Sequence, residues 1–207
     1  MKKSEVMQQL RELKVVSVVR GDSEAEGYNI SEGCIKGGIT AIEVAYTNAH
    51  AGAIIERLKA DYPDALIGAG TVLDAPTARM AILAGATFVV SPSFNAETSV
   101  LCNRYGIPYI PGCMTVREIV EAMESGCEMI KLFPGSAFGP KYIGSLKSPL
   151  PQVSIMVTGG VKLDNAKEWL KSGADAVGVG GEFNKLGAKG DWKAIEEMAA
   201  DYVKEVN

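Results

Sequence analysis

Residues 125–132 read SGCEMIKL, and four further segments share this pattern of a glycine followed by a mostly apolar run. They are GGITAIEV (37–44), AGATFVVS (84–91), YGIPYIPG (105–112) and SGADAVGV (172–179). A glycine just after a helix accepts the left-handed conformation that ends it, and the β-branched residues that follow favour a strand. We therefore expect a helix-to-strand junction at five glycines: Gly38, Gly85, Gly106, Gly126 and Gly173.

Helical patterns lie between the expected strands along the whole chain. In TVREIVEAMES (115–125) the apolar residues share one helix face, and Thr115 with Glu118 forms a capping-box signature that SEAE (23–26) repeats. Most of the expected strands are apolar on both faces, as parallel strands under helices are. These strands are 15–20, 41–46, 66–71, 87–91, 108–111, 128–133, 154–158 and 176–180.

About eight βα units without a linker indicate a single α/β domain over residues 1–207. We predict a (β/α)8 TIM barrel preceded by an N-terminal helix in MKKSEVMQQLREL (1–13). An open doubly wound sheet is the alternative, but it usually has fewer strands.

The composition argues against nucleic-acid and membrane partners. The chain has 207 residues, a formal net charge of −4 and 47% hydrophobic residues, so it offers no broad basic surface to a phosphate backbone. No apolar run approaches the ~20 residues of a membrane span, and the N-terminal segment has no signal-peptide core. We therefore expect a cytoplasmic protein.

The cysteines and the histidine do not suggest a metal site. The four cysteines are widely spaced, without a CxxC pair, and the chain has one histidine. Zinc sites and disulfide frameworks both need closer or more numerous ligands. We expect no metal, and cysteines that are reduced and mostly buried.

Two charged residues interrupt apolar strands. Lys131 lies within MIKLF (129–133), and Glu43 lies within AIEVA (41–45). Side chains alternate along a strand, so Lys131 shares a face with Met129 and Phe133. If the apolar neighbours of the two charged residues face the outer helices, Lys131 and Glu43 both point into the barrel.

A buried lysine and glutamate are better explained by chemistry than by stability, because desolvation tends to cancel the attraction of a buried pair. Burial favours the neutral amine, which can attack a ketone to form a Schiff base. The iminium then accepts electrons, and no metal or other cofactor is needed. The residues leave a structural alternative open, in which Lys131 extends its stem to reach solvent.

Glycine pairs close the last two expected strands in VTGGV (157–161) and VGVGG (177–181). Barrels often hold a phosphate here on backbone N–H groups, and glycine allows the anion to come close. The two pairs together favour an anionic ligand, although tight turns use the same residues. Glu182 follows the second pair, and a carboxylate there would repel a phosphate dianion.

With these residues, the chain resembles the class I pyruvate aldolases of the 2-keto-3-deoxy-6-phosphogluconate (KDPG) and 2-keto-4-hydroxyglutarate (KHG) aldolase family. The resemblance implies a (β/α)8 barrel that is generally trimeric, with a Schiff-base lysine in the sixth strand and a glutamate proton carrier in the second. These roles match Lys131 and Glu43. The resemblance covers nearly the whole chain and rests on VVSVVR (15–20), GGITAIEVAYTN (37–48), IGAGTVL (67–73), VVSPSF (89–94), IPGCMTVRE (110–118), IKLFPG (130–135), VTGGV (157–161) and AVGVGG (176–181).

The resemblance also implies a set of substrate-binding residues. Thr71 and Pro92 would line the pyruvate pocket, and Thr158 would contact the substrate and help to select its stereochemistry. Three glycines would lie by the distal phosphate or carboxylate: Gly159, Gly160 and Gly181.

The chain departs from some well-known members of the family at two positions. Those members place an arginine where this chain has Thr47, and Arg20 at the end of the first strand is then expected to hold the substrate carboxylate. Some relatives carry a serine where this chain has Glu182. That change weakens the expectation of a phosphate and leaves room for a shorter substrate that ends in a carboxylate.

The activity implied by the resemblance is a reversible retro-aldol cleavage of a small keto acid by a homotrimer, in carbohydrate metabolism. KDPG would give pyruvate and glyceraldehyde 3-phosphate, and KHG would give pyruvate and glyoxylate. Two alternatives stay open: a cofactor-free sugar-phosphate isomerase or epimerase with Glu43 as its base, and a catalytically idle barrel that senses a phosphosugar or keto acid. The sequence leaves open the choice among KDPG, its galactonate epimer and KHG, the pathway and the stereochemical strictness.

Overall fold

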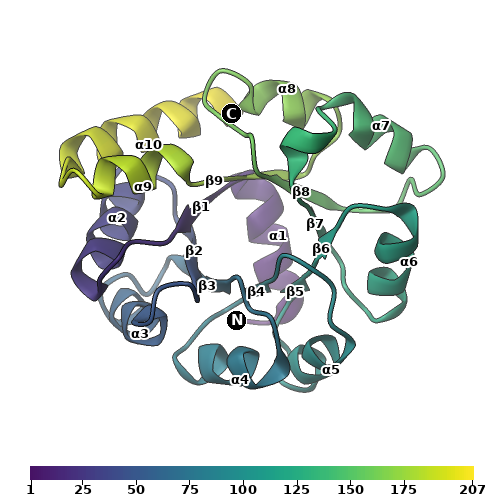
Figure 1. The fold of residues 1–207 in the computed structure, drawn as a ribbon, viewed down its shortest axis with the longest axis horizontal. Helices are drawn as coiled ribbons and strands as arrows, with labels where there is room; N and C mark the ends of the chain where they lie inside the picture. The colour runs from purple at the N-terminus through teal and green to yellow at the C-terminus, as the bar shows by residue number, and fades with distance from the viewer.

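Parallel strands lie side by side around a ring that helices cover on the outside, in a computed structural model that describes residues 1–207 (Figure 1). All pairs are parallel, and the hydrogen-bonded order is β5-β4-β3-β2-β1-β9-β8-β7-β6. The strands are β1 (Val15–Val19), β2 (Ala41–Ala45), β3 (Leu66–Gly70), β4 (Val89–Val90), β5 (Tyr109–Ile110), β6 (Gly112–Cys113), β7 (Ile130–Leu132), β8 (Ile155–Thr158) and β9 (Ala176–Val179).

The ring closes at β5 and β6, which are two parts of one strand interrupted at Pro111. Tyr109 of β5 pairs with Val89 of β4, whereas Gly112 of β6 pairs with Lys131 of β7. Proline has no N–H to donate, but the Pro111 carbonyl accepts a hydrogen bond from the Lys131 N–H at 2.8 Å. The nine strands thus occupy eight barrel positions, and the predicted (β/α)8 barrel is confirmed.

Helices follow the strands in alternation, and two of them begin at the predicted caps. Thr115 and Glu118 form a reciprocal capping box. Ser23 accepts from the Glu26 N–H, but Glu26 in turn accepts from the Asp22 N–H, so the second predicted box is only half formed. The helices are α1 (Lys3–Leu13), α2 (Glu24–Lys36), α3 (Ala51–Asp61), α4 (Ala75–Leu83), α5 (Ala96–Arg104), α6 (Val116–Glu124), α7 (Lys141–Lys147), α8 (Ala166–Lys171), α9 (Gly181–Gly187) and α10 (Trp192–Val206), with a 3₁₀ turn at Gly135–Ala137.

The five junction glycines all have positive φ angles, as predicted: Gly38 (97°), Gly85 (98°), Gly106 (67°), Gly126 (84°) and Gly173 (105°). Each lies between a helix and the next strand. None of the helices has the length and apolar character that crossing a membrane requires.

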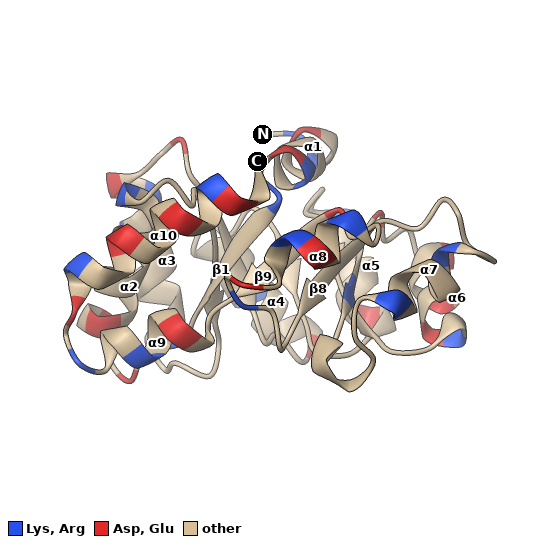
Figure 2. Ribbon diagram, turned by 90° about the horizontal axis from the view of Figure 1, so that it is seen from above, with Lys and Arg blue, Asp and Glu red and all other residues tan.

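Helix α1 closes one end of the barrel. Its apolar side chains Val6, Met7 and Leu10 are buried and pack with residues that directly precede strands, such as Phe88 before β4 and Met129 before β7. Figure 1 shows α1 across the opening on the far side of the ring, and Figure 2 shows it at one end of the barrel. The strands begin at this end, so their C-terminal ends surround the opposite opening.

A second apolar layer lies between the barrel and the outer helices. It includes the outward-facing strand residues Ile42, Val44, Ile130 and Leu132. Figure 2 shows the charged residues of both signs mostly on the outer helices. Alternation along each strand therefore directs one set of side chains to this layer and the other set to the barrel interior.

Candidate active site

Lys131 and Glu43 form an ion pair inside the barrel. The Lys131 Nζ atom lies 3.4 Å from Glu43 Oε1, with 6% of the lysine side chain and none of the glutamate side chain exposed. Lys131 is the central residue of β7 and Glu43 is the central residue of β2. The predicted orientation of both side chains is therefore confirmed, and the alternative in which Lys131 reaches solvent is wrong.

Glu43 has one oxygen without a partner. Glu43 Oε2 is buried and makes no hydrogen bond, and leaving such an acceptor unpaired is costly. A Cβ atom at Gly70, which pairs with Ala45 at the end of β3, would collide with the Glu43 carboxylate. The glycine therefore makes space for the carboxylate, and Oε2 can accept a proton or a hydrogen bond from a bound molecule.

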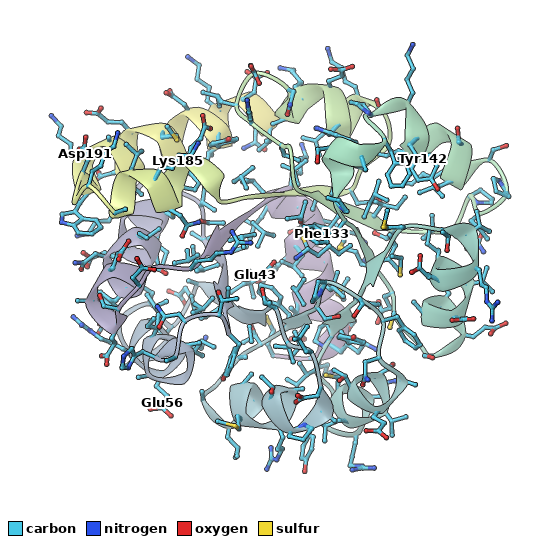
Figure 3. The ribbon with its side chains drawn as sticks, viewed as in Figure 1. Glu43, Glu56, Phe133, Tyr142, Lys185 and Asp191 are labelled. Atoms are coloured by element: carbon cyan, nitrogen blue, oxygen red, sulfur yellow. The ribbon has the colours of Figure 1, made fainter.

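Phe133 lies beside the amine at the end of β7. Its ring centroid is 5.2 Å from Lys131 Nζ, a distance at which an aromatic face interacts with a cation. Figure 3 shows Glu43 and Phe133 both near the centre of the ring. Because Phe133 also lines a cavity, it connects the buried pair with that cavity.

Thr158 is the third polar side chain of the interior. It ends β8, is 8% exposed, and its Oγ1 atom has no hydrogen-bond partner. Gly178 of β9 pairs with Thr158, and a Cβ atom at Gly178 would collide with this hydroxyl oxygen. Two unpaired oxygens, those of Thr158 and Glu43, thus lie in a barrel interior that also holds the amine.

A cavity of about 260 Å³ opens at the C-terminal ends of β1, β8 and β9. Arg20, Thr158 and the three predicted glycines line it. Its full lining is Val18, Arg20, Phe133, Thr158, Gly159, Gly160, Val161, Lys162, Gly178, Gly180, Gly181, Glu182, Phe183, Lys185 and Tyr202.

The cavity lining carries three cations for one carboxylate. Arg20, Lys162 and Lys185 form no ion pair with any carboxylate. Glu182 Oε2 instead accepts a hydrogen bond from the Tyr202 hydroxyl at 3.1 Å. Burial first, and the charge of Glu182 second, raise the pKa of Tyr202, so its hydroxyl stays protonated as the donor. The cavity therefore suits an anion.

Two of the predicted residues lie outside this cavity. Thr71 directly follows β3 and has a φ angle of 55°, which is strained for a β-branched residue. Pro92 follows β4, and a Cβ atom at Gly112 would collide with its carbonyl. Both residues lie at strand ends on the β3–β4 side of the ring, whereas the cavity lies at β1, β8 and β9.

Several site residues have only a weak signal in the sequence. Lys162 comes two residues after Gly160, and Lys185 lies three residues after Glu182, about one turn along α9. Tyr202 comes from α10, and no local pattern connects it with Glu182. Glu182 and Tyr202 meet only because α9 and α10 pack together.

The cysteines are as predicted, and no cluster of metal ligands appears. All four are free and buried. Burial raises the pKa of the Cys34, Cys102 and Cys113 thiols to about 12. Nowhere do three His, Cys, Asp or Glu side chains come close enough together to hold a metal ion.

An enclosed amine, a carboxylate and a hydroxyl beside a cationic cavity can perform carbonyl chemistry on an anionic molecule. The amine can add to a ketone, and the carboxylate can move the protons that this addition requires. The cations can hold acidic groups of the same molecule.

Comparison with known proteins agrees with this chemistry. The family model described as KDPG and KHG aldolase matches residues 6–198. The chain is 33% identical to the 2-dehydro-3-deoxy-phosphogluconate aldolase of Haemophilus influenzae, over 96% of this chain and 95% of that protein. It is 32% identical to the 2-dehydro-3-deoxy-6-phosphogalactonate aldolase of Escherichia coli, over 96% and 97% of the two chains.

One similar solved structure contains a covalent reaction intermediate. The chain superimposes with a TM-score of 0.87 on the KDPG aldolase from Legionella pneumophila, at 28% identity and over 97% of both chains. That crystal holds pyruvate captured at low pH as a covalent carbinolamine intermediate. The chain therefore belongs to the KDPG and KHG aldolase family and is an aldehyde-lyase of the class I, pyruvate-dependent type.

Proposed function

We propose that this aldolase cleaves KDPG to pyruvate and glyceraldehyde 3-phosphate, KHG to pyruvate and glyoxylate, or both, through a Schiff base on Lys131. The observation that carries the proposal is the enclosed pair of Lys131 and Glu43, with 3.4 Å between Nζ and Oε1. A pair buried only for stability is unfavourable because both groups lose their hydration. An amine beside a proton acceptor is what Schiff-base formation requires.

The reaction begins when the neutral amine of Lys131 attacks the C2 ketone. The C2 oxygen takes up a proton and gives a carbinolamine, which loses water to leave an iminium. Glu43 carries the protons, either directly or through a water molecule, and its unpaired Oε2 is free to do so. Thr158 Oγ1 offers a second partner for a substrate oxygen.

Cleavage follows from the iminium. The C4 hydroxyl gives up its proton, the C3–C4 bond breaks, and the bonding electrons move to the iminium nitrogen to form an enamine. The aldehyde leaves, C3 of the enamine takes up a proton, and water hydrolyses the resulting iminium. Pyruvate departs, and the free amine of Lys131 is restored.

The two ends of the substrate are proposed to use different parts of the site. Arg20, Thr71, Pro92 and Thr158 hold the pyruvate part, so that the ketone meets the amine in a reactive geometry. Guanidinium binds a carboxylate through two hydrogen bonds, and Arg20 has no carboxylate of its own in the protein.

The distal end is proposed to lie by Gly159, Gly160 and Gly181. Lys162 and Lys185 add positive charge there, and both are unpaired. Glu182 adds negative charge, but its carboxylate is hydrogen-bonded to Tyr202. The surplus of cations supports an anionic distal group, which KDPG, its galactonate epimer and KHG all have.

The experiment that tests the proposal is reductive trapping. The protein is incubated with pyruvate and borohydride, and the modified peptide is identified by mass spectrometry. We expect one reduced pyruvyl adduct, on Lys131, and no adduct in Lys131→Ala, which should also lose cleavage of all three keto acids. Lys162→Ala serves as a control, because it removes a cavity amine and should keep the adduct.

Other outcomes would replace the proposal. If pyruvate binds without an adduct and sugar phosphates are interconverted, the isomerase or epimerase reading is correct. If ligands raise the melting temperature without turnover, the barrel is a sensor. Near-wild-type cleavage by Lys131→Ala would show that another group carries the reaction.

We also propose that residues 1–207 form one domain that assembles as a homotrimer. Pairing of β1 with β9 joins the two ends of the chain in one ring. Five large apolar side chains are exposed on and beside α4 and α5, and Leu83 is the most exposed of them at 68%. They are Leu73, Met80, Leu83, Val100 and Tyr105. We call these five residues the α4–α5 patch and infer that it forms the subunit contact.

A cytoplasmic location is part of the proposal. Four buried free thiols suit a reducing compartment, in which disulfides are rare. Cell fractionation with an antibody to the protein tests the location, and recovery outside the cytoplasmic fraction would contradict it.

A further inference from the structure

The side chain of Arg20 forms no ion pair, whereas its main chain is held in place by hydrogen bonds. Arg20 lies in the irregular segment after β1, is exposed, and lines the cavity. Asn184 Oδ1 accepts a hydrogen bond from the Arg20 N–H at 2.8 Å, and Asn48 Nδ2 donates to the Arg20 carbonyl at 2.9 Å. Both main-chain polar groups of a loop residue are therefore held by side chains from other elements.

Asn184 ties the Arg20 segment to the last strand and helix. Its amide nitrogen donates to the Val18 carbonyl at 2.9 Å and to the Gly180 carbonyl at 2.6 Å. A Cβ atom at Gly180 would collide with the Val18 carbonyl, so the two chain segments approach closely at this point. One side chain on α9 thus connects the end of β1 with the end of β9.

Asn48 holds the other side of the same turn. It lies between β2 and α3, is 4% exposed, and its amide nitrogen also donates to the carbonyls of Gly21 and Ser23 at 3.1 and 3.0 Å. Its amide oxygen accepts from the His50 N–H at 2.8 Å. Gly21 has a φ angle of 65°, as a tight turn requires.

We propose that Asn184 and Asn48 are positioning residues that aim the Arg20 guanidinium at the carboxylate of the keto acid. The inference rests on the proposed function, in which Arg20 binds that carboxylate. Neither asparagine lines the cavity, so each would act through Arg20. An arginine on a fixed main chain loses less conformational entropy on binding than one on a mobile loop, and its planar fork meets the carboxylate in the right orientation.

A double-mutant cycle tests the inference. Asn184→Ala should raise KM about tenfold for the better of KDPG and KHG and leave kcat within about twofold, because it weakens binding equally in the ground and transition states. Arg20→Ala should raise KM at least as much. Because Asn184 acts through Arg20, the double variant should have the KM of Arg20→Ala alone.

Asn103→Ala is the matched control. Asn103 on α5 also bridges segments with its amide, which donates to the Ser125 carbonyl at 2.9 Å and accepts from Lys3 Nζ at 3.0 Å. It does not line the cavity, and its replacement should leave KM unchanged. Asn48→Ala removes four hydrogen bonds of a buried side chain. Asn184→Ala is therefore measured before Asn48→Ala, so that a folding defect in the latter does not decide whether the inference holds.

Two results would overturn the inference, and they can be told apart. If Asn184→Ala raises KM equally in the Arg20→Ala background, the asparagine does not act through the arginine, while the proposed function stands. If Arg20→Ala leaves KM unchanged, the inference and the proposed role of Arg20 fall together. The Schiff base on Lys131 is tested separately by trapping, so its failure is distinguished from both.

Discussion

The hydrogen atom that replaces a side chain at Gly70 leaves room for the carboxylate of Glu43. Gly70 ends β3, and a Cβ atom there would collide with that carboxylate. We expect Gly70→Ala to displace the carboxylate from Lys131 and to lower kcat at least about tenfold, because proton transfer requires hydrogen-bond reach. Steady-state cleavage of KDPG and KHG measures the loss.

Gly144→Ala gives the comparison for this substitution. Gly144 is exposed in α7, and no atom lies within 4 Å of the place where its Cβ would be. Activity should stay unchanged there, and stability should rise by up to about 1 kcal/mol because alanine favours a helix. Overpacking at Gly70 costs about 1–3 kcal/mol, and urea unfolding shows whether Gly70→Ala stays folded. If it does, displacement of the Glu43 carboxylate, and not misfolding, accounts for the lower kcat. Wild-type kcat in Gly70→Ala would contradict the role proposed for Glu43.

The sequence predicts the orientation of some site residues but not the role of others. Lys131 and Glu43 could be oriented because strand side chains alternate, and each charge interrupts an apolar run. Asn184 could not be found in this way, because its role depends on Val18 and Arg20, which lie more than a hundred residues away in the sequence. Local patterns reveal which face a side chain occupies, but not which distant main-chain groups it meets.

At the scale of elements, the strand pattern predicts the barrel and misses one detail of its closure. The sequence predicts a fifth strand at 108–111, whereas the structure has β5 at Tyr109–Ile110 and β6 at Gly112–Cys113. Proline and glycine both discourage a strand, so the pattern stops at Pro111. Pairing with β7 overrides this local preference, because the Pro111 carbonyl and Gly112 complete the ring.

Three buried thiols make the stability of the layer between barrel and helices depend on pH. Burial raises the pKa of Cys34 on α2, Cys102 on α5 and Cys113 on β6 from 9.0 to about 12. The folded state favours the neutral thiol, so this contribution is complete below pH 9 and is lost as the pH rises towards 12. We expect the free energy of urea unfolding to fall between pH 8.0 and 9.5 by about 1 kcal/mol per thiol.

Cys34→Ala tests the cause of this pH dependence. It should lower stability at both pH values through lost packing, and it should make the fall between them smaller. An unchanged fall would show that other groups, such as the buried tyrosines, account for it. The same unfolding curves test the one-domain proposal, since a single domain should unfold in one transition.

In the whole molecule, the cavity and the α4–α5 patch lie in different places. Helix α1 closes one end of the ring, and the cavity opens at the C-terminal ends of β1, β8 and β9. The α4–α5 patch lies on the outer wall, across the ring from α8 and α10 in Figure 1. Subunits can therefore meet through this patch without covering the cavity of their own barrel.

The α4–α5 patch carries two strongly exposed side chains on one helix. Leu83 is 68% and Met80 is 62% exposed, which is unusual for large apolar side chains that lie near one another. Leu83→Glu should convert a trimer into monomers, because a charge within an apolar contact loses its hydration. Light scattering after size-exclusion chromatography measures the mass. Val116→Glu is the control, since Val116 is 42% exposed but lies on α6, and it should stay trimeric. A trimeric Leu83→Glu, or a monomeric wild type at micromolar concentration, would mean that the α4–α5 patch is not the subunit contact.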